Sequence, residues 1–184
     1  MTVTETPLAG VLVIEPVVHR DPRGFFLETY RADRYRAAGI DATFVQANHS
    51  RSTRNTLRGL HWQEGAHPQA KLVRAVVGEV FDVAVDIRPD SPTFGRWFGL
   101  HISADNFRQI YIPVGFAHGF CVLSDVAEIE YQCSDVYDRA SERGLMWNDP
   151  DLNIQWPIAE PLLSDRDRQH PTFRDFRAQA AASR

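Results

Sequence analysis

Short stretches in which apolar and polar residues alternate make up most of the chain up to Cys133. They are rich in Val, Ile, Phe and Tyr, and turn-forming segments such as Pro89–Pro92 separate them. The predicted strands are Gly10–Val18, Phe25–Tyr30, Thr43–Ser50, Thr56–Gln63, Lys71–Val76, Glu79–Ile87, Trp97–Ile102, Arg108–Pro113, Gly119–Leu123 and Ala127–Cys133. Many short strands at this spacing are typical of an antiparallel sandwich or barrel of the jelly-roll type.

Helical signals are few and weak. They comprise Ala32–Ala38, a turn at Asp105 and an Arg- and Ala-rich tail from Thr172. From Tyr137 onward the chain is rich in Pro and Asp, and we expect it to pack as ordered loops against the sheets. No linker, repeat or low-complexity segment interrupts the sequence. Residues 1–184 are therefore expected to form one all-β domain with a few short helices and an extended C-terminal region.

The composition is that of an ordinary globular protein, with 43% hydrophobic and 24% charged residues. A formal net charge of −4 argues against a surface that coats nucleic acid, although a local basic pocket remains compatible with it. The first residues carry no basic segment followed by an apolar run, and no later run is long enough to span a bilayer. We expect a cytoplasmic protein, with neither nucleic acid nor membrane among its partners.

The two cysteines, Cys121 and Cys133, lie within predicted strands and lack the spacing of metal ligands. We interpret them as small buried hydrophobic residues in a reducing compartment. The alternative is a disulfide bond between them.

Lys71 is the only lysine among 20 basic residues. Biased codon usage that leaves one lysine by chance is one explanation. The other is a need for a compact ammonium, whose point charge and rotatable donors suit a single developing oxyanion better than a guanidinium does.

Gln46 and Asn48 are two residues apart on a predicted strand, so their side chains point to one face. That face is either exposed to solvent or part of a site, and the pair alone does not decide between them.

His61 lies in a strand whose alternation gives it the same face as Leu57 and Gln63. It is either a core histidine with satisfied hydrogen bonds or a general base, since imidazole exchanges protons near neutral pH. Arg58 falls on the opposite face unless Gly59 forms a β-bulge.

Lys71 follows His61 by ten residues, a distance at which a hairpin brings the two side chains together. A base with a nearby cation suits proton abstraction beside a carbonyl, with the cation holding the enolate oxygen. Tyr131 lies on the opposite strand face from two glutamates and is expected to point inward. It is either a hydrogen-bonded core tyrosine or the donor of a proton to the other side of a planar enolate.

The segment Ile112–Phe120 contains a Pro-x-Gly-x-x-His pattern ending at His118, which matches half of the metal-binding signature of cupins. The other half requires a His-x-His pair and a glutamate, whereas this chain has His61, Trp62 and Gln63 there. One remaining histidine with a glutamine is a poor ligand set for a transition metal, so we expect no metal at these positions.

Together these motifs closely resemble one family, the dTDP-4-dehydrorhamnose 3,5-epimerases, which are cupins without a metal. The matching segments are Asp21–Phe26 with Glu28, Gln46–Asn48, Leu57–His61, Gln69–Lys71, Gly78–Asp86, Ser91–Gly95, Gly115–Gly119, Trp147–Pro150 and Leu163–Asp167. The resemblance spans nearly the whole chain and implies a cupin-type jelly roll that needs no cofactor.

The resemblance also implies roles for single residues. His61 matches the catalytic base, Asp167 the carboxylate that orients it, and Tyr131 the proton donor. Lys71 matches the residue beside the C4 oxygen of the sugar. The positions that match substrate-binding residues are Arg23, Phe26, Glu28, Gln46, Asn48, Arg58, Lys71, His118, Tyr137, Glu142 and Arg166. Of these, Tyr137 matches the aromatic residue that stacks on thymine, and the arginines suit a diphosphate.

The implied activity is epimerisation at C3 and C5 of a dTDP-4-keto-6-deoxy sugar by a homodimer whose N-terminal strands are exchanged. The chain departs from the family pattern at Trp62, Val136 and Arg166, where members commonly have Tyr, an aromatic residue and Lys. A mono-epimerase acting at C3 or C5 alone remains open. The further alternatives are a non-catalytic cupin that binds sugar nucleotides and a metal-dependent cupin oxygenase or isomerase.

Overall fold

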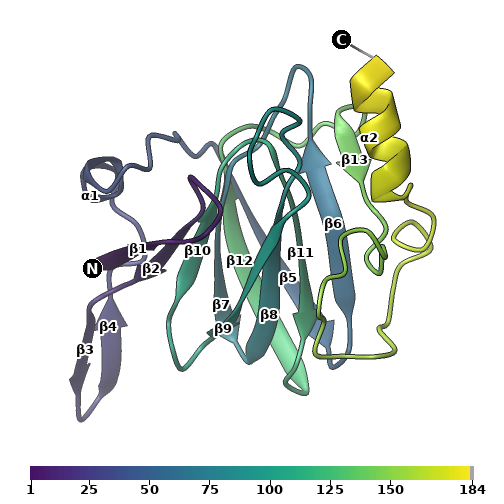
Figure 1. The fold of residues 1–184 in the computed structure, drawn as a ribbon. Coiled ribbons are helices and arrows are strands. Elements are labelled where there is room, and N and C mark those ends of the chain that lie inside the picture. Colours follow the sequence, from purple (N-terminus) through teal and green to yellow (C-terminus); the bar gives the residue numbers. More distant parts are fainter. Residues whose placement is uncertain (183–184) are drawn as a thin grey trace.

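The computed structural model describes residues 1–182, and most of the strands belong to two antiparallel sheets (Figure 1). The larger sheet has, in spatial order, β1 (Thr2–Glu5), β2 (Leu12–Glu15), β10 (Gln109–Ile112), β7 (Lys71–Val77), β12 (Val126–Cys133) and β5 (Gln46–Thr53). The smaller has β13 (Glu142–Gly144), β6 (Leu57–Gln63), β11 (Phe116–Val122), β8 (Glu79–Asp86) and β9 (Trp97–Ser103). This arrangement confirms the predicted all-β sandwich of the jelly-roll type.

The two sheets face each other across an apolar core. Alternate residues of each strand point inward, so one face of every strand contributes to this core. Its buried side chains from the larger sheet include Val73, Ala75, Ile110, Ile112, Ala127 and Ile129, and those from the smaller include Val80, Ala84, Ile102, Phe116, Phe120 and Val122. The polar side chains that lie between the sheets, among them His61 and Lys71, line a cavity beside this apolar core.

The C-terminal third covers the outer face of the smaller sheet, as predicted for the region that follows Tyr137. Leu145, Leu152 and Phe173 pack there against Val83 and Val85 of β8. The helix α2 (Phe173–Ala182) lies on this side of the molecule, next to β13 and β6 (Figure 1). Since both faces of β8 are covered, nearly all of its residues are buried. Part of the C-terminal segment, including Asp167, also lines the cavity between the sheets.

The N-terminal region packs on the larger sheet through the short helix α1 (Ala32–Ala37). Its Tyr35 is buried with Ile14, Leu72 and Tyr111 in a second apolar cluster, and its hydroxyl lies 3.0 Å from Oε1 of Gln109. Neither helix of residues 1–182 is long and apolar enough to cross a membrane.

A hairpin of β3 (Val18–Asp21) and β4 (Gly24–Leu27) projects from the body of the molecule (Figure 1). Phe25 and Phe26 at its end are 56% and 70% exposed, which is unusual for phenylalanine. Although Phe107 packs against Phe25, the hairpin presents apolar surface that residues 1–182 leave largely uncovered.

Several predicted boundaries are wrong. Gly10–Val18 is two strands, β2 and β3, because Pro16 between them has no N–H to donate to a sheet. The edge strand β1 and the three-residue β13 were not predicted, since neither has a run of alternating apolar residues. β11 begins at Phe116, three residues before the predicted start.

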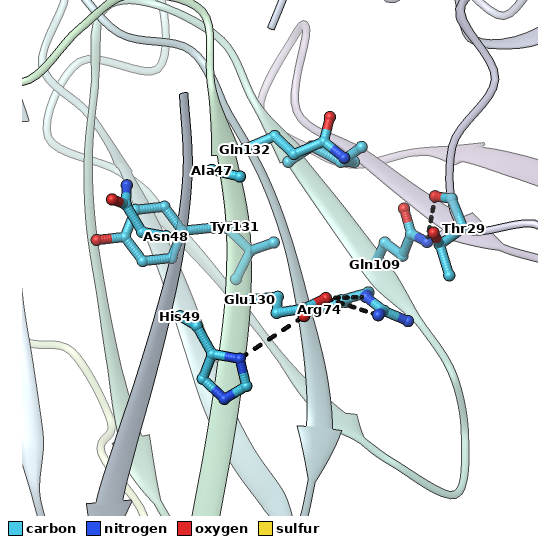
Figure 2. A pocket seen from close by; sticks show the side chains of 11 residues that line it. Thr29, Ala47, Asn48, His49, Arg74, Gln109, Glu130, Tyr131 and Gln132 are labelled. Carbon is cyan, nitrogen blue, oxygen red and sulfur yellow. Dashed lines mark hydrogen bonds and ion pairs between the residues drawn. The ribbon is translucent and has the colours of Figure 1, made fainter. Parts of the chain in front are cut away.

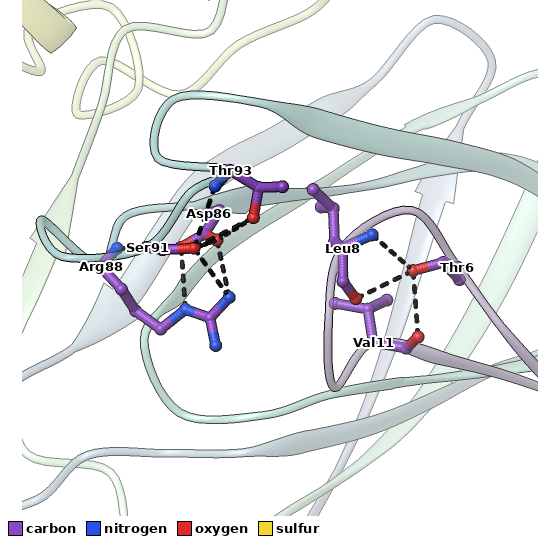
Figure 3. Close-up of polar contacts among 7 residues, drawn as sticks. All are labelled: Thr6, Leu8, Val11, Asp86, Arg88, Ser91 and Thr93. Atoms are coloured by element: carbon purple, nitrogen blue, oxygen red, sulfur yellow. Dashed lines mark hydrogen bonds and ion pairs between the residues drawn. The ribbon is translucent and has the colours of Figure 1, made fainter.

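Asp86 organises the loop that follows β8 (Figure 3). Its fully buried carboxylate accepts hydrogen bonds from Nη2 of Arg88 at 2.6 Å, Oγ of Ser91 at 2.6 Å and Oγ1 of Thr93 at 2.5 Å. Burial alone would raise the pKa of Asp86, but these hydrogen bonds lower it to about 2. Asp86 is thus a structural carboxylate that remains charged.

Candidate functional site

A polar cavity opens between the two sheets. One part, of about 490 Å³, is lined by Arg58, His118 and residues of the C-terminal segment. The adjoining part, of about 320 Å³, reaches Gln46 and Tyr137. Three residues line both parts and therefore lie where the two join, namely His61 of β6, Lys71 of β7 and Tyr131 of β12. The three side chains thus converge as predicted, but the predicted hairpin between His61 and Lys71 is wrong, because β6 and β7 belong to different sheets and meet across the cavity.

A β-bulge in β6 brings Arg58 to the same cavity as His61. His61 pairs with His118 of β11 and Arg58 pairs with Phe120, so two residues of β6 face one residue of β11 between these pairs. Gly59 occupies the bulge with φ +133°, and a Cβ there would lie 2.5 Å from the Cα of Gly119. Only glycine fits at that approach, and without the bulge Arg58 would point to the other face.

His61 is bound to Asp167, which reaches it from the C-terminal segment. Nε2 of His61 lies 2.5 Å from Oδ1 of Asp167, and Ser164 donates its hydroxyl to Oδ2 at 2.9 Å. The carboxylate is buried, whereas 27% of the His61 side chain is exposed to the cavity. Burial opposes ionisation of Asp167, but contacts with His170 and His61 outweigh it and hold the pKa well below its usual value. Asp167 is therefore an anion at neutral pH.

His170, which the sequence analysis did not single out, is a second imidazole beside Asp167. Its Nε2 lies 3.4 Å from Oδ1 of Asp167, and its ring meets that of His61 edge to face at 5.4 Å. The spacing Asp-x-x-His in a turn could have indicated that these two side chains are neighbours, since turns bring residues i and i+3 together.

Lys71 and Tyr131 line the junction from the larger sheet. The Lys71 ammonium lies within electrostatic range of Asp82 and Glu142 but forms no ion pair at contact distance within residues 1–182. Burial lowers the pKa of Lys71 and raises the pKa of Tyr131. The tyrosine hydroxyl is accordingly protonated at neutral pH and able to donate.

The second part of the cavity has a hydrogen-bonded polar rim. Nε2 of Gln46 donates to Oδ1 of Asn48 at 3.1 Å, and Oε1 of Gln46 accepts from the backbone N–H of Tyr137 at 2.8 Å. Glu142 accepts from the Tyr137 hydroxyl at 2.6 Å and pairs with Arg166 at 2.7 Å. Burial would raise the pKa of Glu142, but these two partners lower it. The half-exposed ring of Tyr137 is therefore held at the mouth of the cavity.

His118 and Arg58 lie on the other side of His61. Nε2 of His118 contacts both carboxylate oxygens of Asp82, at 3.0 and 2.9 Å, and only 8% of its side chain is exposed. Nε of Arg58 donates to Oγ of Ser52 at 3.0 Å, which leaves the terminal nitrogens of the guanidinium for an anion.

Arg23, Phe26 and Glu28 are the predicted site residues that line neither part of the cavity. Arg23 and Phe26 lie on the projecting hairpin, where the Arg23 side chain is 90% exposed and pairs only with Asp21 among the described residues. Glu28 pairs with Arg34 at 3.1 Å near α1. Within one chain, the structure does not bring these three residues to His61.

Another hollow, of about 230 Å³, lies on the outer face of the larger sheet (Figure 2). Its charged groups satisfy one another, since Glu130 binds Arg74 at 2.6 Å and His49 at 3.6 Å. Tyr131 points away from these ion pairs in Figure 2, together with Asn48. This hollow therefore has no free base or cation, and the interior cavity is the better site for chemistry.

The residues able to hold a metal ion differ from the cupin set that the sequence analysis rejected. Among residues 1–182, His61, Asp167 and His170 have ligand atoms within 4.8 Å of one another. His118 belongs to no such group in the described part of the chain, because it is bound to Asp82 alone.

Comparisons with known proteins agree on one family. The family model described as dTDP-4-dehydrorhamnose 3,5-epimerase matches residues 5–175. The protein of that name from Shigella flexneri is 53% identical over 176 residues, which cover 95% of this chain and 97% of that one. A dTDP-4-dehydrorhamnose 3-epimerase from Streptomyces niveus is 44% identical over 162 residues, 88% of this chain and 78% of that one.

Solved structures agree with the sequence relatives. The crystal structure of a dTDP-6-deoxy-D-glucose-3,5-epimerase from Legionella pneumophila, in complex with dTDP-4-keto-L-rhamnose, superposes with a TM-score of 0.93. It is 46% identical and covers 97% of this chain and 95% of its own.

Proposed function

The chain belongs to the dTDP-4-dehydrorhamnose 3,5-epimerase family, and on that premise we propose that it converts dTDP-4-dehydro-6-deoxy-D-glucose to dTDP-4-dehydro-L-rhamnose. The conversion inverts C3 and C5 of the sugar. The hydrogens on both carbons are acidic because each carbanion is delocalised onto the C4 ketone. A base, an oxyanion partner and an acid are therefore all that the reaction requires of the protein.

The observation that carries the proposal is the junction of His61, Lys71 and Tyr131, with His61 backed by a buried carboxylate. Nε2 of His61 donates to Asp167, which leaves Nδ1 to accept the proton from C3 or C5. The Lys71 ammonium stabilises the enolate oxygen at C4. Tyr131, which comes from the opposite sheet, protonates the other face of the enolate. His61 then releases its proton to solvent and Tyr131 regains one from solvent, so both groups are restored for the second carbon.

Inversion requires that the new proton arrive on the face opposite to the one that lost it. His61 belongs to the smaller sheet and Tyr131 to the larger, so a flat enolate between the sheets has one group on each side. Asp167 stabilises the imidazolium that forms, since the carboxylate is charged and buried against it.

The polar groups around the junction support binding of a sugar nucleotide. We assign Gln46, Asn48, Arg58, His118, Glu142 and Arg166 to the substrate, with Tyr137 stacking on the thymine. An anionic diphosphate suits Arg58, because the terminal guanidinium nitrogens form bidentate contacts with phosphate oxygens.

We further propose that the protein is a homodimer in which the N-terminal strands are exchanged. The projecting hairpin carries Arg23 and Phe26 away from its own cavity, exposed and uncovered. If the hairpin of one copy inserts at the mouth of the cavity in a second copy, it adds a cation for the diphosphate and an aromatic ring for the thymine of the substrate. Sedimentation analysis of the protein and of an Asp21–Leu27 deletion tests this, with a monomeric wild-type protein contradicting it.

The proposed reaction is tested by incubating the protein with the 4-keto sugar nucleotide in D2O and following the sugar by NMR. Deuterium at both C3 and C5 supports the double epimerase. If neither C3 nor C5 takes up deuterium, the protein has no epimerase activity and the proposal is wrong.

A mono-epimerase is the second candidate, because a 3-epimerase lies among the relatives at 44% identity. It would place deuterium at one carbon only. The same experiment therefore separates the two candidates without a further reagent.

A cytoplasmic location is supported by the two cysteines. Cys121 and Cys133 are both buried free thiols, which suit a reducing compartment. Measurement of the protein in separated cell fractions tests this assignment.

A further inference from the structure

His170 has a nitrogen that the protein leaves without a hydrogen-bond partner. The imidazole side chain is nine-tenths buried, and its Nε2 finds no hydrogen-bond partner within residues 1–182. Oδ1 of Asp167 lies 3.4 Å from this nitrogen, a contact that lacks hydrogen-bond geometry. Burying a polar atom in this way is costly, so its position calls for a ligand.

The space for this imidazole depends on Gly144 in β13, which pairs directly with His61 in β6. A Cβ at position 144 would lie 2.3 to 2.5 Å from three atoms of the His170 ring. The ring therefore packs flat against the backbone of β13 beside His61. Any other residue at 144 would displace it, so the second imidazole is built into the fold rather than resting on the surface.

We propose that His61, Asp167 and His170 form an inhibitory binding site for Zn²⁺. Two imidazole nitrogens and one carboxylate are ligands that zinc accepts, whereas Mg²⁺ and Ca²⁺ prefer sites made of oxygen alone. The three ligand atoms already lie within 4.8 Å of one another. This donor set is distinct from the cupin signature around His118.

Zinc requires the three ligand atoms, which now lie within 4.8 Å of one another, to take up nearly equal separations. Ligand atoms around a tetrahedral zinc ion are about 3.3 Å apart, given Zn–N bonds of about 2.0 Å. The His170–Asp167 separation of 3.4 Å already matches, while the His61–Asp167 contact of 2.5 Å must open. Ser164, which donates to the other oxygen of Asp167, keeps the carboxylate oriented meanwhile.

The fourth coordination position faces the cavity. His61 is 27% exposed there, so a hydrated ion can enter and keep a water molecule as its remaining ligand. Zinc bound to Nε2 of His61 moves the proton of the neutral imidazole to Nδ1, with no net release of a proton. Inhibition rests on the proposed function, in which Nδ1 is the base, whereas zinc binding does not.

Zinc binding is measured by calorimetry with ZnCl2 on the metal-free protein, with MgCl2 as the comparison ion. We expect one zinc per chain in the wild-type protein and binding weakened at least about tenfold in His170→Gln, since loss of a ligand removes one of three bonds. The matched control is His101→Gln, because the His101 imidazole bonds to the single carboxylate of Glu79 and packs on Phe81, outside the proposed site. That control should bind zinc as the wild type does.

Crystals of the wild-type protein soaked in ZnCl2 locate the ion by anomalous scattering at the zinc edge, whether or not the variant folds. A peak between the three side chains supports the proposal. The proposal is wrong if the peak lies elsewhere or if His170→Gln binds zinc with the affinity of the wild type. It is also wrong if the wild-type protein binds no zinc at a zinc concentration of about 100 μM.

Measuring the epimerase rate with and without ZnCl2 distinguishes failure of the zinc site from failure of the proposed function. Zinc should slow the wild-type enzyme more than His170→Gln, each relative to its own zinc-free rate. If zinc binds at the site without slowing an active enzyme, the inhibitory role is wrong while the site stands. If no epimerase activity exists, the proposed function fails while the calorimetry still decides the site.

Discussion

Two histidine–aspartate pairs stand side by side in this molecule, His61 with Asp167 and His118 with Asp82. The histidines are direct partners in the register of β6 and β11. Yet 27% of the His61 side chain is exposed and only 8% of that of His118. Both imidazoles line the cavity, but that of His61 is the more exposed of the two.

The origin of the aspartates explains this difference. Asp82 lies on β8, the strand next to β11, so its contact with His118 forms within the sheet. Asp167 comes from the C-terminal segment, 106 residues away from His61. The same chemical pair is therefore rigid in one place and assembled across the fold in the other, and the assembled pair is the one suited to moving protons.

The largest expected effect that separates the pairs is on turnover. His61→Asn should lower kcat by a factor on the order of 10² to 10⁴, the usual contribution of a general base. The matched His118→Asn should mainly raise KM, because we assign His118 to binding. Steady-state kinetics on both variants measures this, and a larger loss of kcat in His118→Asn would reverse the comparison.

The next largest effect separates Asp167, whose loss should lower turnover, from Asp82, whose loss should lower stability. Asp167→Asn should keep the substrate bound but lower kcat by about 10- to 100-fold, since the imidazolium loses its buried anion. Asp82→Asn should instead cost about 1 to 3 kcal/mol of the free energy of unfolding, because Asp82 is fully buried against His118. Kinetics and urea denaturation of both variants distinguish the roles. The prediction fails if both variants lose the same property.

Lys71 offers a test of the oxyanion contact. Lys71→Arg should lower kcat about tenfold, because the planar guanidinium is larger than the ammonium and spreads its charge. Arg36→Lys on the exposed face of α1 is the charge-preserving control and should be neutral. Full activity in Lys71→Arg would leave the single lysine as a matter of codon usage.

The last effect concerns Asp86, a carboxylate with a structural role only, and it bears on stability rather than on turnover. Its pKa is about 2 in the folded protein, against 3.8 for an unperturbed aspartate, so the folded state favours the anion. Its contribution of about 2 kcal/mol to the free energy of unfolding is complete above about pH 4 and is lost as the pH falls toward about 2. The gap in the free energy of unfolding between wild type and Asp86→Asn, measured by urea denaturation, should narrow as the pH falls from neutral toward about 2, and a constant gap would contradict this.

The sequence predicted the parts of the site that lie on regular strands. The inward faces of His61 and Tyr131 follow from alternation, because a side chain's face is a local property of a strand. Lys71 was singled out by being the only lysine and by its distance of ten residues from His61. Asp167 carries no local signal, since a loop is placed by packing of distant residues. It was assigned only by family resemblance.

Dependence on residues that are distant in the sequence also explains why the positions of Arg58 and His170 were not predicted. Arg58 faces the cavity because of the β-bulge at Gly59. The glycine indicated that a bulge was possible there, but strict alternation does not predict one. His170 was missed because its meaning depends on Gly144 and Asp167, which meet it only in the folded chain. The fold class, in contrast, follows from the repeated short strands, whose pattern is redundant along the chain.

The central claim is that the His61–Asp167 pair, and not the His118–Asp82 pair, takes the proton from the sugar. It is tested most directly by deuterium wash-in, measured by NMR, in His61→Asn and His118→Asn at saturating substrate. The account predicts no wash-in at C3 or C5 for His61→Asn and wash-in at both for His118→Asn. Persistent exchange at either carbon in His61→Asn would contradict it.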